Sequence, residues 1–256
     1  MTDNPVLSTK NMAIGYGRGS GINRVLADLD LEANEGQLIA VIGANGTGKS
    51  TLLKSLAGLL PLLEGRIRLN GCETYKLKPS KLATLISIVL TERIQPGYLT
   101  VGDLVAMGRH PYTDWQGRLQ KQDLDACLKA LQITGLSHMQ RQKLHTLSDG
   151  QLQKAMIARA LAQDGALLLL DEPLIHLDIS SKWEIMGILK RMTLDRSKTV
   201  ILATHELELS LEMADRIWLI NKTRQLITGT PEDMVQNGVI SETFDTEHYK
   251  FRKGDW

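Results

Sequence analysis

The sequence predicts an α/β protein built around a mostly parallel central sheet. Short apolar runs alternate with longer amphipathic stretches, which is typical of strands that alternate with helices. A glycine-rich segment follows one of these runs and two acidic residues follow another, so we expect polar functional residues at the ends of strands. Four runs are nearly continuous in apolar residues, as expected for strands covered on both faces: residues 38–42, 85–90, 167–170 and 200–203.

Length and charge exclude several classes of protein. The chain has 256 residues, and its 30 basic and 29 acidic side chains leave a formal charge of +1. Bulk charge therefore indicates neither nucleic acid nor an anionic membrane as a partner. The longest apolar stretches fall far short of the ~20 residues that cross a bilayer, so we expect any membrane role to be peripheral. Two cysteines, Cys72 and Cys127, provide neither a disulfide framework nor a metal quartet, which favours a reducing cytoplasm.

The first third of the chain predicts a second, antiparallel layer. Apolar and polar residues alternate at 27–31 and at 67–69, which is typical of half-buried strands. The second of these runs closes on Asn70-Gly71, a strong hairpin-turn pair. We therefore expect a small antiparallel sheet near the N-terminus.

The middle of the chain predicts a helical insertion into the parallel sheet. Residues 101–162 are polar-rich with a helical period, and 120–131 form one amphipathic helix in this prediction. No repeat or proline-rich linker divides the chain. We expect a single domain over 1–256, made of a β-rich core over about 1–90, a helical subdomain over 91–162, and the rest of the core with a short tail over 163–256.

The glycine-rich turn after residues 38–42 predicts a cradle for phosphates. It matches the P-loop pattern and precedes a helical run at 50–59, the context that this motif requires. Glycines let backbone N–H groups point at an anion; Lys49 is placed to reach the β- and γ-phosphates and Ser50 to bind Mg²⁺. The expected phosphate-binding residues are Gly43, Ala44, Asn45, Gly46, Thr47, Gly48, Lys49, Ser50 and Thr51.

Carboxylates follow the run at 167–170. Asp171 and Glu172 stand at the carboxyl end of a buried strand, where open α/β sheets bind ligands. Asp171 is placed to hold Mg²⁺ and Glu172 to act as the base for an attacking water, a role usually worth ~10² to 10⁴ in rate. His205, just past the run at 200–203, is expected at the same edge, near the γ-phosphate.

A second anion site is predicted at Leu147, Ser148, Asp149, Gly150 and Gln151. These residues form a capping box at the start of a helix that runs to about residue 163. The free amides and the positive end of the helix dipole face outward. One small protein rarely needs two phosphate cradles, so we expect the second to complete the first site of a twin subunit.

Taken together, these motifs resemble the nucleotide-binding subunit of an ABC transporter. The match spans nearly all of the chain and includes, in the family's order, the P-loop, LSDGQ, LLLLDE, Leu177-Asp178 and Thr204-His205. The resemblance implies a P-loop NTPase fold, ATP and Mg²⁺ as cofactors, and ATP hydrolysis that uses Lys49, Glu172 and His205. It also implies that Asp178 belongs to the D-loop and that Tyr16 stacks on adenine, where stacking contributes ~1 to 3 kcal/mol. Without the resemblance Tyr16 would be only a strand aromatic.

Three positions depart from the family pattern. Asp149 replaces a glycine of the usual LSGGQ. Two like unit charges 4 Å apart repel by ~4 kcal/mol at an effective dielectric near 20, which is the situation of this carboxylate beside a phosphate. We therefore expect the Asp149 side chain to turn toward solvent or a base. At the position of the usual Q-loop glutamine the chain has Thr91 followed by Glu92, and either side chain could bind the metal. Glu92 could equally be a carboxylate in a solvated loop with no role in the site. At Leu174-Ile175 we expect local repacking.

Residues 100–112 resemble the matching stretch of bacterial importers for iron-siderophores, haem and cobalamin. The resemblance implies a homodimer of the ATPase, integral membrane permease subunits, an external substrate-binding protein, and a place on the cytoplasmic face of the bacterial inner membrane. Tyr98, Tyr112 and Trp115 are candidate contacts with the permease, although core packing is the expected fate of any single one.

Other classes of protein account for fewer of these motifs. An exporter subunit is the nearest alternative. A soluble ABC ATPase would need a long coiled-coil insertion or a second cassette, and the chain has neither. A P-loop kinase or GTPase would leave LSDGQ and His205 without a role.

Overall fold

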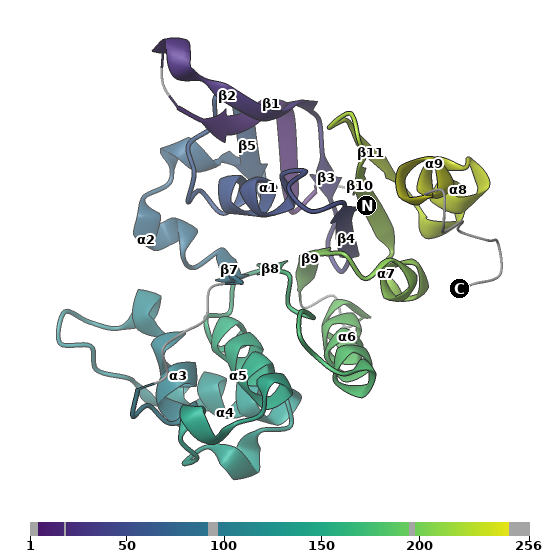
Figure 1. Cartoon of the computed structure of the whole chain (residues 1–256). Helices are drawn as coiled ribbons and strands as arrows, with labels where there is room; N and C mark the ends of the chain where they lie inside the picture. Colours follow the sequence, from purple (N-terminus) through teal and green to yellow (C-terminus); the bar gives the residue numbers. More distant parts are fainter. Residues whose placement is uncertain (1–4, 18, 92–96, 195–197, 246–256) are drawn as a thin grey trace.

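Two sheets and a group of helices make up the computed structural model, which describes residues 5–17, 19–91, 97–194 and 198–245 (Figure 1). The central sheet has six strands in the order β11-β10-β4-β9-β8-β7. Its strands are β4 (Leu38–Gly43), β7 (Ile86–Val89), β8 (Leu167–Asp171), β9 (Thr199–Thr204), β10 (Arg216–Ile220) and β11 (Leu226–Gly229). All neighbours are parallel except β11, which runs antiparallel to β10. The predicted α/β fold with a mostly parallel sheet is confirmed.

Strands β4, β8 and β9 of the central sheet are buried on both faces. In β4, Ile39 and Val41 pack into one apolar cluster, whereas Leu38, Ala40 and Ile42 pack into another on the opposite face. Strands β8 and β9 alternate in the same way. This two-sided burial is why the four runs read as continuously apolar.

The antiparallel sheet has the strand order β2-β1-β5-β6, with β3 paired to β1. Its strands are β1 (Leu7–Tyr16), β2 (Asn23–Leu29), β3 (Glu32–Ala33), β5 (Glu64–Leu69) and β6 (Cys72–Glu73). The turn at Asn70-Gly71 joins β5 to β6 as predicted, with positive φ at both residues. The predicted antiparallel layer is confirmed. The alternating run at 27–31 belongs to β2 only as far as Leu29, where the strand ends, and Asp28 has a φ of 54° beside an irregular register.

Helix α1 (Lys49–Leu56) lies between the two sheets (Figure 1). It is shorter than the run predicted at 50–59. Gly58 has a φ of 73°, and the N–H of Leu59 donates to the carbonyl of Lys54 at 2.9 Å. This pair of features is a left-handed helix ending, and it turns the chain toward β5.

The helical subdomain contains α3 (Val101–Met107), α4 (Lys121–Ile133) and α5 (Asp149–Ala162), which pack on one another beside the β7 edge of the central sheet (Figure 1). Helix α4 extends two residues past the predicted end, and Gln120 is its N-cap rather than its first residue. The remaining helices are α2 (Pro79–Leu82), α6 (Ile179–Leu194), α7 (Leu207–Met213), α8 (Pro231–Gln236) and α9 (Val239–Phe244). Within the described ranges, none of the helices has the length and apolar character needed to span a bilayer.

The candidate interface aromatics are not in the core. The side chains of Tyr98 and Trp115 are 88% and 90% exposed, so the expectation of core packing is wrong for both. Both belong to connecting segments around α3 and α4, where no apolar cluster covers them. The side chain of Tyr112 makes specific contacts with its neighbours. Its hydroxyl donates to the carbonyl of Gln163 at 2.9 Å, and the centre of its ring lies 3.8 Å from the Arg109 guanidinium.

A buried ion pair connects the three helices of this subdomain. Nε of Arg109, just after α3, donates to Oδ1 of Asp123 in α4 at 2.9 Å, and Nη1 of the same arginine donates to the carbonyl of Ala162 at the end of α5 at 2.7 Å. Both side chains are almost fully buried. Removing one partner of such a pair leaves a charge without compensation, which typically costs about 3 to 5 kcal/mol.

We expect Asp123→Asn to lower the free energy of unfolding by about 3 kcal/mol, measured by urea denaturation. The N–H of Gln120 and the Arg109 guanidinium hold the pKa of Asp123 below its ordinary value. The carboxylate therefore stabilises the fold above its unfolded pKa, and this contribution is lost as pH falls through the lowered value. The difference between the two proteins should shrink at acid pH.

The matched control is Asp125→Asn, which removes an exposed carboxylate from the same helix and should change stability by less than about 0.5 kcal/mol. Equal stability of the two variants would contradict a structural role for the buried pair.

Candidate functional site

The predicted site residues gather at one edge of the central sheet. Strands β4, β7, β8 and β9 are parallel, so their carboxyl ends meet there. The P-loop follows β4, Asp171 ends β8, Thr91 follows β7, and His205 follows β9. This is the edge at which open α/β sheets bind ligands.

The P-loop folds around the ammonium group of Lys49. Its Nζ donates to the carbonyls of Gly43 at 2.9 Å and Ala44 at 3.3 Å, and the side chain is only 5% exposed. The loop meets α1 at Gly48, which has a φ of 110° that favours glycine. Backbone N–H groups at the start of α1 are thereby free to bind an anion.

Asp171 and the hydroxyl of Ser50 form the predicted metal-binding pair. Ser50 Oγ donates to Asp171 Oδ1 at 2.7 Å, and Thr91 Oγ1 donates to the backbone carbonyl of Asp171 at 3.0 Å. Mg²⁺ prefers oxygen ligands shared with phosphates, so this donor set fits that ion. Among the residues placed in the structure, no group of three His, Cys, Asp or Glu side chains could hold a metal by itself. The remaining ligands would be phosphate oxygens and water.

Glu172 lies between two basic side chains. Its Oε2 is 2.8 Å from Nδ1 of His205, and its Oε1 is 3.4 Å from Nζ of Lys49. The residue has a φ of 50°, and its backbone N–H donates to the carbonyl of Ala203 in β9 at 2.9 Å. Of the three side chains predicted to be catalytic, Glu172 therefore contacts both Lys49 and His205 at the sheet edge.

A cleft of about 600 Å³ extends from the P-loop toward the antiparallel sheet. Tyr16, at the end of β1, lines it, and its hydroxyl lies 3.0 Å from Oγ1 of Thr51 in α1. The cleft is of the size and mixed polarity that small ligands occupy. The full set of lining residues is Tyr16, Asn23, Val25, Asn45, Gly46, Gly48, Lys49, Ser50, Thr51, Lys54, Thr91, Asp171, Glu172 and Arg224.

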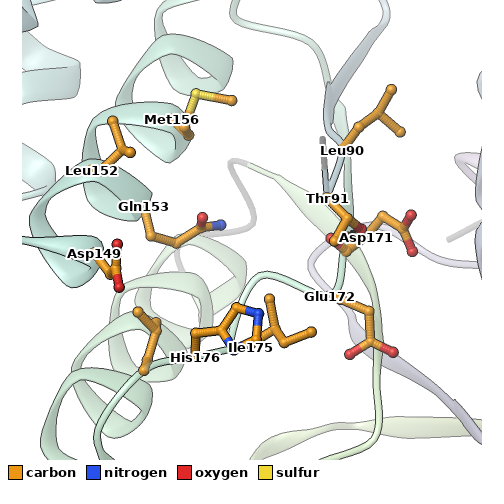
Figure 2. Close-up of a pocket in the computed structure, with 11 residues that line it drawn as sticks. Leu90, Thr91, Asp149, Leu152, Gln153, Met156, Asp171, Glu172, Ile175 and His176 are labelled. Carbon is orange, nitrogen blue, oxygen red and sulfur yellow. Dashed lines mark hydrogen bonds between the residues drawn. The ribbon is translucent and has the colours of Figure 1, made fainter. Parts of the chain in front are cut away.

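The residues predicted to form a second anion site lie elsewhere. Ser148 caps α5, accepting from the N–H of Gln151, while the Gln151 side chain accepts from the N–H of Ser148. None of the residues 147–151 lines the 600 Å³ cleft. Asp149 is exposed and lines a smaller cavity of about 130 Å³, in which α5 stands across from Thr91 and Asp171 (Figure 2). One chain therefore does not bring Ser148 to the cleft that holds Lys49.

Two further predicted residues have separate outcomes. Asp178 caps the start of α6: its Oδ1 accepts from the N–H of Ser181 and its Oδ2 from the hydroxyl, each at 2.8 Å. The backbone bond is the main reason that the pKa of Asp178 is lowered. Glu92 lies outside the described residues, so its role stays a prediction.

Sequence reasoning missed several lining residues. Arg224 reaches the 600 Å³ cleft from the turn after β10 and Asn23 from the start of β2, and His176 lines the cavity of Figure 2 with a φ of 62°. None of them stands at a spacing that a motif would mark. At Leu174-Ile175, where the sequence predicts only local repacking, Leu174 is buried in the core and Ile175 is exposed at the cavity.

Comparisons with known proteins identify the family to which the chain is similar. Residues 26–175 match the family model described as ABC transporter. The chain is 34% identical to the petrobactin import ATP-binding protein FpuD of Bacillus anthracis, over 94% of this chain and 87% of that one. It is 33% identical to the ferric enterobactin transport ATP-binding protein FepC of Escherichia coli, over 93% and 86%.

Solved structures show the same fold. A metal-chelate type ABC transporter in an inward-facing conformation is similar with a TM-score of 0.81 and 27% identity, over 94% of this chain and 89% of that one. A dimeric bacterial ABC transporter cassette is similar with a TM-score of 0.71 and 27% identity, over 83% and 93%.

We expect Gly48→Ala to weaken nucleotide binding by about tenfold or more, measured by titration with a fluorescent nucleotide. The added methyl group would lie 2.4 Å from Cγ1 of Val25, at a φ that disfavours alanine. The P-loop must then shift away from its anion-binding geometry. The control is Gly135→Ala, which has a φ of 72° but open space around it. Unchanged nucleotide binding in Gly48→Ala would contradict the assignment of the P-loop as the phosphate-binding site.

Proposed function

Because this chain belongs to the ABC transporter family of ATP-binding subunits, we propose that it hydrolyses ATP to drive an importer of ferric siderophores or related metal chelates. The observation that carries the enzymatic part is the group formed by the P-loop lysine, Asp171 and Glu172 at one sheet edge. The chain is an ATPase of this family, and a soluble ABC ATPase or a small-molecule kinase is not favoured.

The cargo class is supported by the relatives. FpuD and FepC are named for petrobactin and ferric enterobactin, and a similar structure is of a metal-chelate transporter. These names favour a siderophore over haem and cobalamin, the other cargoes that the sequence indicated, and an importer over an exporter. Co-purification with a multi-span permease, followed by uptake of labelled ferric siderophore, would test this assignment; export of the cargo would contradict it.

In the proposed reaction, water attacks the γ-phosphorus while the bond to the β–γ bridging oxygen breaks, giving ADP and phosphate. Glu172 accepts the proton of that water, and His205 orients the carboxylate through its 2.8 Å contact. Lys49 and the N–H groups of the P-loop bind the phosphate oxygens. Ser50 and Asp171 would hold Mg²⁺, which polarises those oxygens when bound.

The arrangement of the two anion sites supports a head-to-tail homodimer. Ser148 lies outside the cleft lined by Lys49, so a second copy has to supply residues 147–151 to the first copy's γ-phosphate. A similar cassette has been solved as a dimer. In this proposal ATP joins the two subunits, and loss of the γ-phosphate lets them separate, as in a two-state switch biased by ligand.

The permease contact is proposed at the exposed aromatics of the helical subdomain. Tyr98 and Trp115 are almost fully exposed beside α3 and α4, which fits residues that a membrane subunit covers. The chain would then work at the cytoplasmic face of the bacterial inner membrane, with an external binding protein delivering the cargo to the permease.

We expect Glu172→Gln to bind ATP but to hydrolyse it about 10² to 10⁴ times more slowly, because the amide cannot accept the proton of water. The variant should accumulate as an ATP-bound dimer in size-exclusion chromatography. Glu208→Gln, an exposed change in α7, is the control and should behave as the natural protein. Normal turnover in Glu172→Gln would assign the base to another residue.

We expect Asp149→Gly to keep or raise the steady-state ATPase rate. The substitution removes a carboxylate next to residues that bind phosphate, and the Asp149 side chain is exposed, so no buried contact is lost. A large decrease in rate would show that Asp149 has a positive role in the dimer.

A further inference from the structure

A basic side chain that no motif predicts reaches the nucleotide cleft from the turn between β10 and β11. Arg224 lines the 600 Å³ cleft together with Asn45, Gly46 and Lys49 of the P-loop. Strand β10 runs parallel to β4 with Ile220 opposite Gly43, so β10 ends where the P-loop begins. The turn that follows β10 therefore starts beside the cradle.

The turn is held in one shape by Asn221. Oδ1 of Asn221 accepts from the backbone N–H groups of Thr223 at 3.0 Å and Gln225 at 2.9 Å, and from the Thr223 hydroxyl at 2.8 Å. The N–H of Arg224 donates to the carbonyl of Asn221 at 3.0 Å. These bonds keep Arg224 at a φ of 60°, a conformation that favours glycine or asparagine. The residue at this strained position is nevertheless an arginine.

The guanidinium of Arg224 makes no polar contact with the described part of the chain. It is exposed, and it has neither a hydrogen bond nor an ion pair with a described residue. Lys49, in contrast, is buried and already donates to two P-loop carbonyls. Arg224 can therefore turn toward a ligand without breaking a hydrogen bond or ion pair with a described residue.

We propose that Arg224 binds the phosphate chain of the nucleotide held by its own subunit. A guanidinium presents a planar fork of donors that matches phosphate oxygens, and charge-assisted bonds of this kind are among the stronger ones at protein surfaces. A pre-shaped turn lowers the entropic cost of placing the arginine. The residue is a nucleotide-binding residue in addition to the P-loop, and the proposal rests on the nucleotide site described above.

The test compares the affinities of adenosine, AMP, ADP and ATP, measured by competition with a fluorescent ATP analogue. Arg224→Gly removes the guanidinium and suits the φ of 60°, so the turn should persist. We expect this variant to bind ATP and ADP about three to ten times more weakly, with adenosine unchanged. The first member of the series to lose affinity identifies the phosphate that Arg224 contacts. The loss should be smaller at high salt, because an exposed contact is screened.

Two further variants sharpen the result. Lys222→Gln removes a neighbouring exposed charge that does not line the cleft, and it should leave all four affinities unchanged. Arg224→Lys keeps the charge and loses the fork, so it should bind ADP and ATP with intermediate affinity. Equal binding by Arg224→Gly and the natural protein would overturn the proposal, as would an equal loss for adenosine. Failure of the natural protein to bind ATP would instead contradict the nucleotide site itself.

Discussion

The register of the central sheet is the constraint on which the site depends. Backbone pairing sets Asp171 opposite Ala203, and Ile42 opposite Thr204. The residues that follow these pairs, Glu172, Gly43 and His205, therefore leave the sheet at a common level. A shift of one residue in any of these strands would turn alternate side chains to the opposite face and separate Glu172 from its two basic neighbours. The positions of Glu172 and His205 are thus set by the backbone pairing of strands that are mainly apolar, with Asp171 as the last residue of β8.

The sequence predicts the central sheet and the cradle well, because both depend on strong local signals. Continuous apolar runs mark strands covered on both faces, and the P-loop pattern fixes residue types at each position. The failures occur where local pattern and tertiary contacts compete. Asp28 interrupts an alternating run through a left-handed backbone, and Gly58 ends α1 earlier than its apolar period indicates.

Residues brought to the site by turns could not be predicted in the same way. Arg224 stands far from the P-loop in sequence, and only the pairing of β10 with β4 places it there. The aromatic residues around α3 were expected in the core because large apolar side chains usually are. Tyr98 and Trp115 are instead exposed, which is the arrangement that a contact surface requires.

The buried pair of Arg109 and Asp123 fixes one end of the helical subdomain. It joins the end of α3, the start of α4 and the end of α5 to one another. Helix α5 has 14 residues and is therefore about 21 Å long, with the fastening at one end and Ser148 at the other. If α5 rotates as a rigid rod about the end that the ion pair holds, Ser148 is displaced farther than any residue near that end. Any rotation about the Arg109 end would therefore be largest at the predicted anion-binding residues.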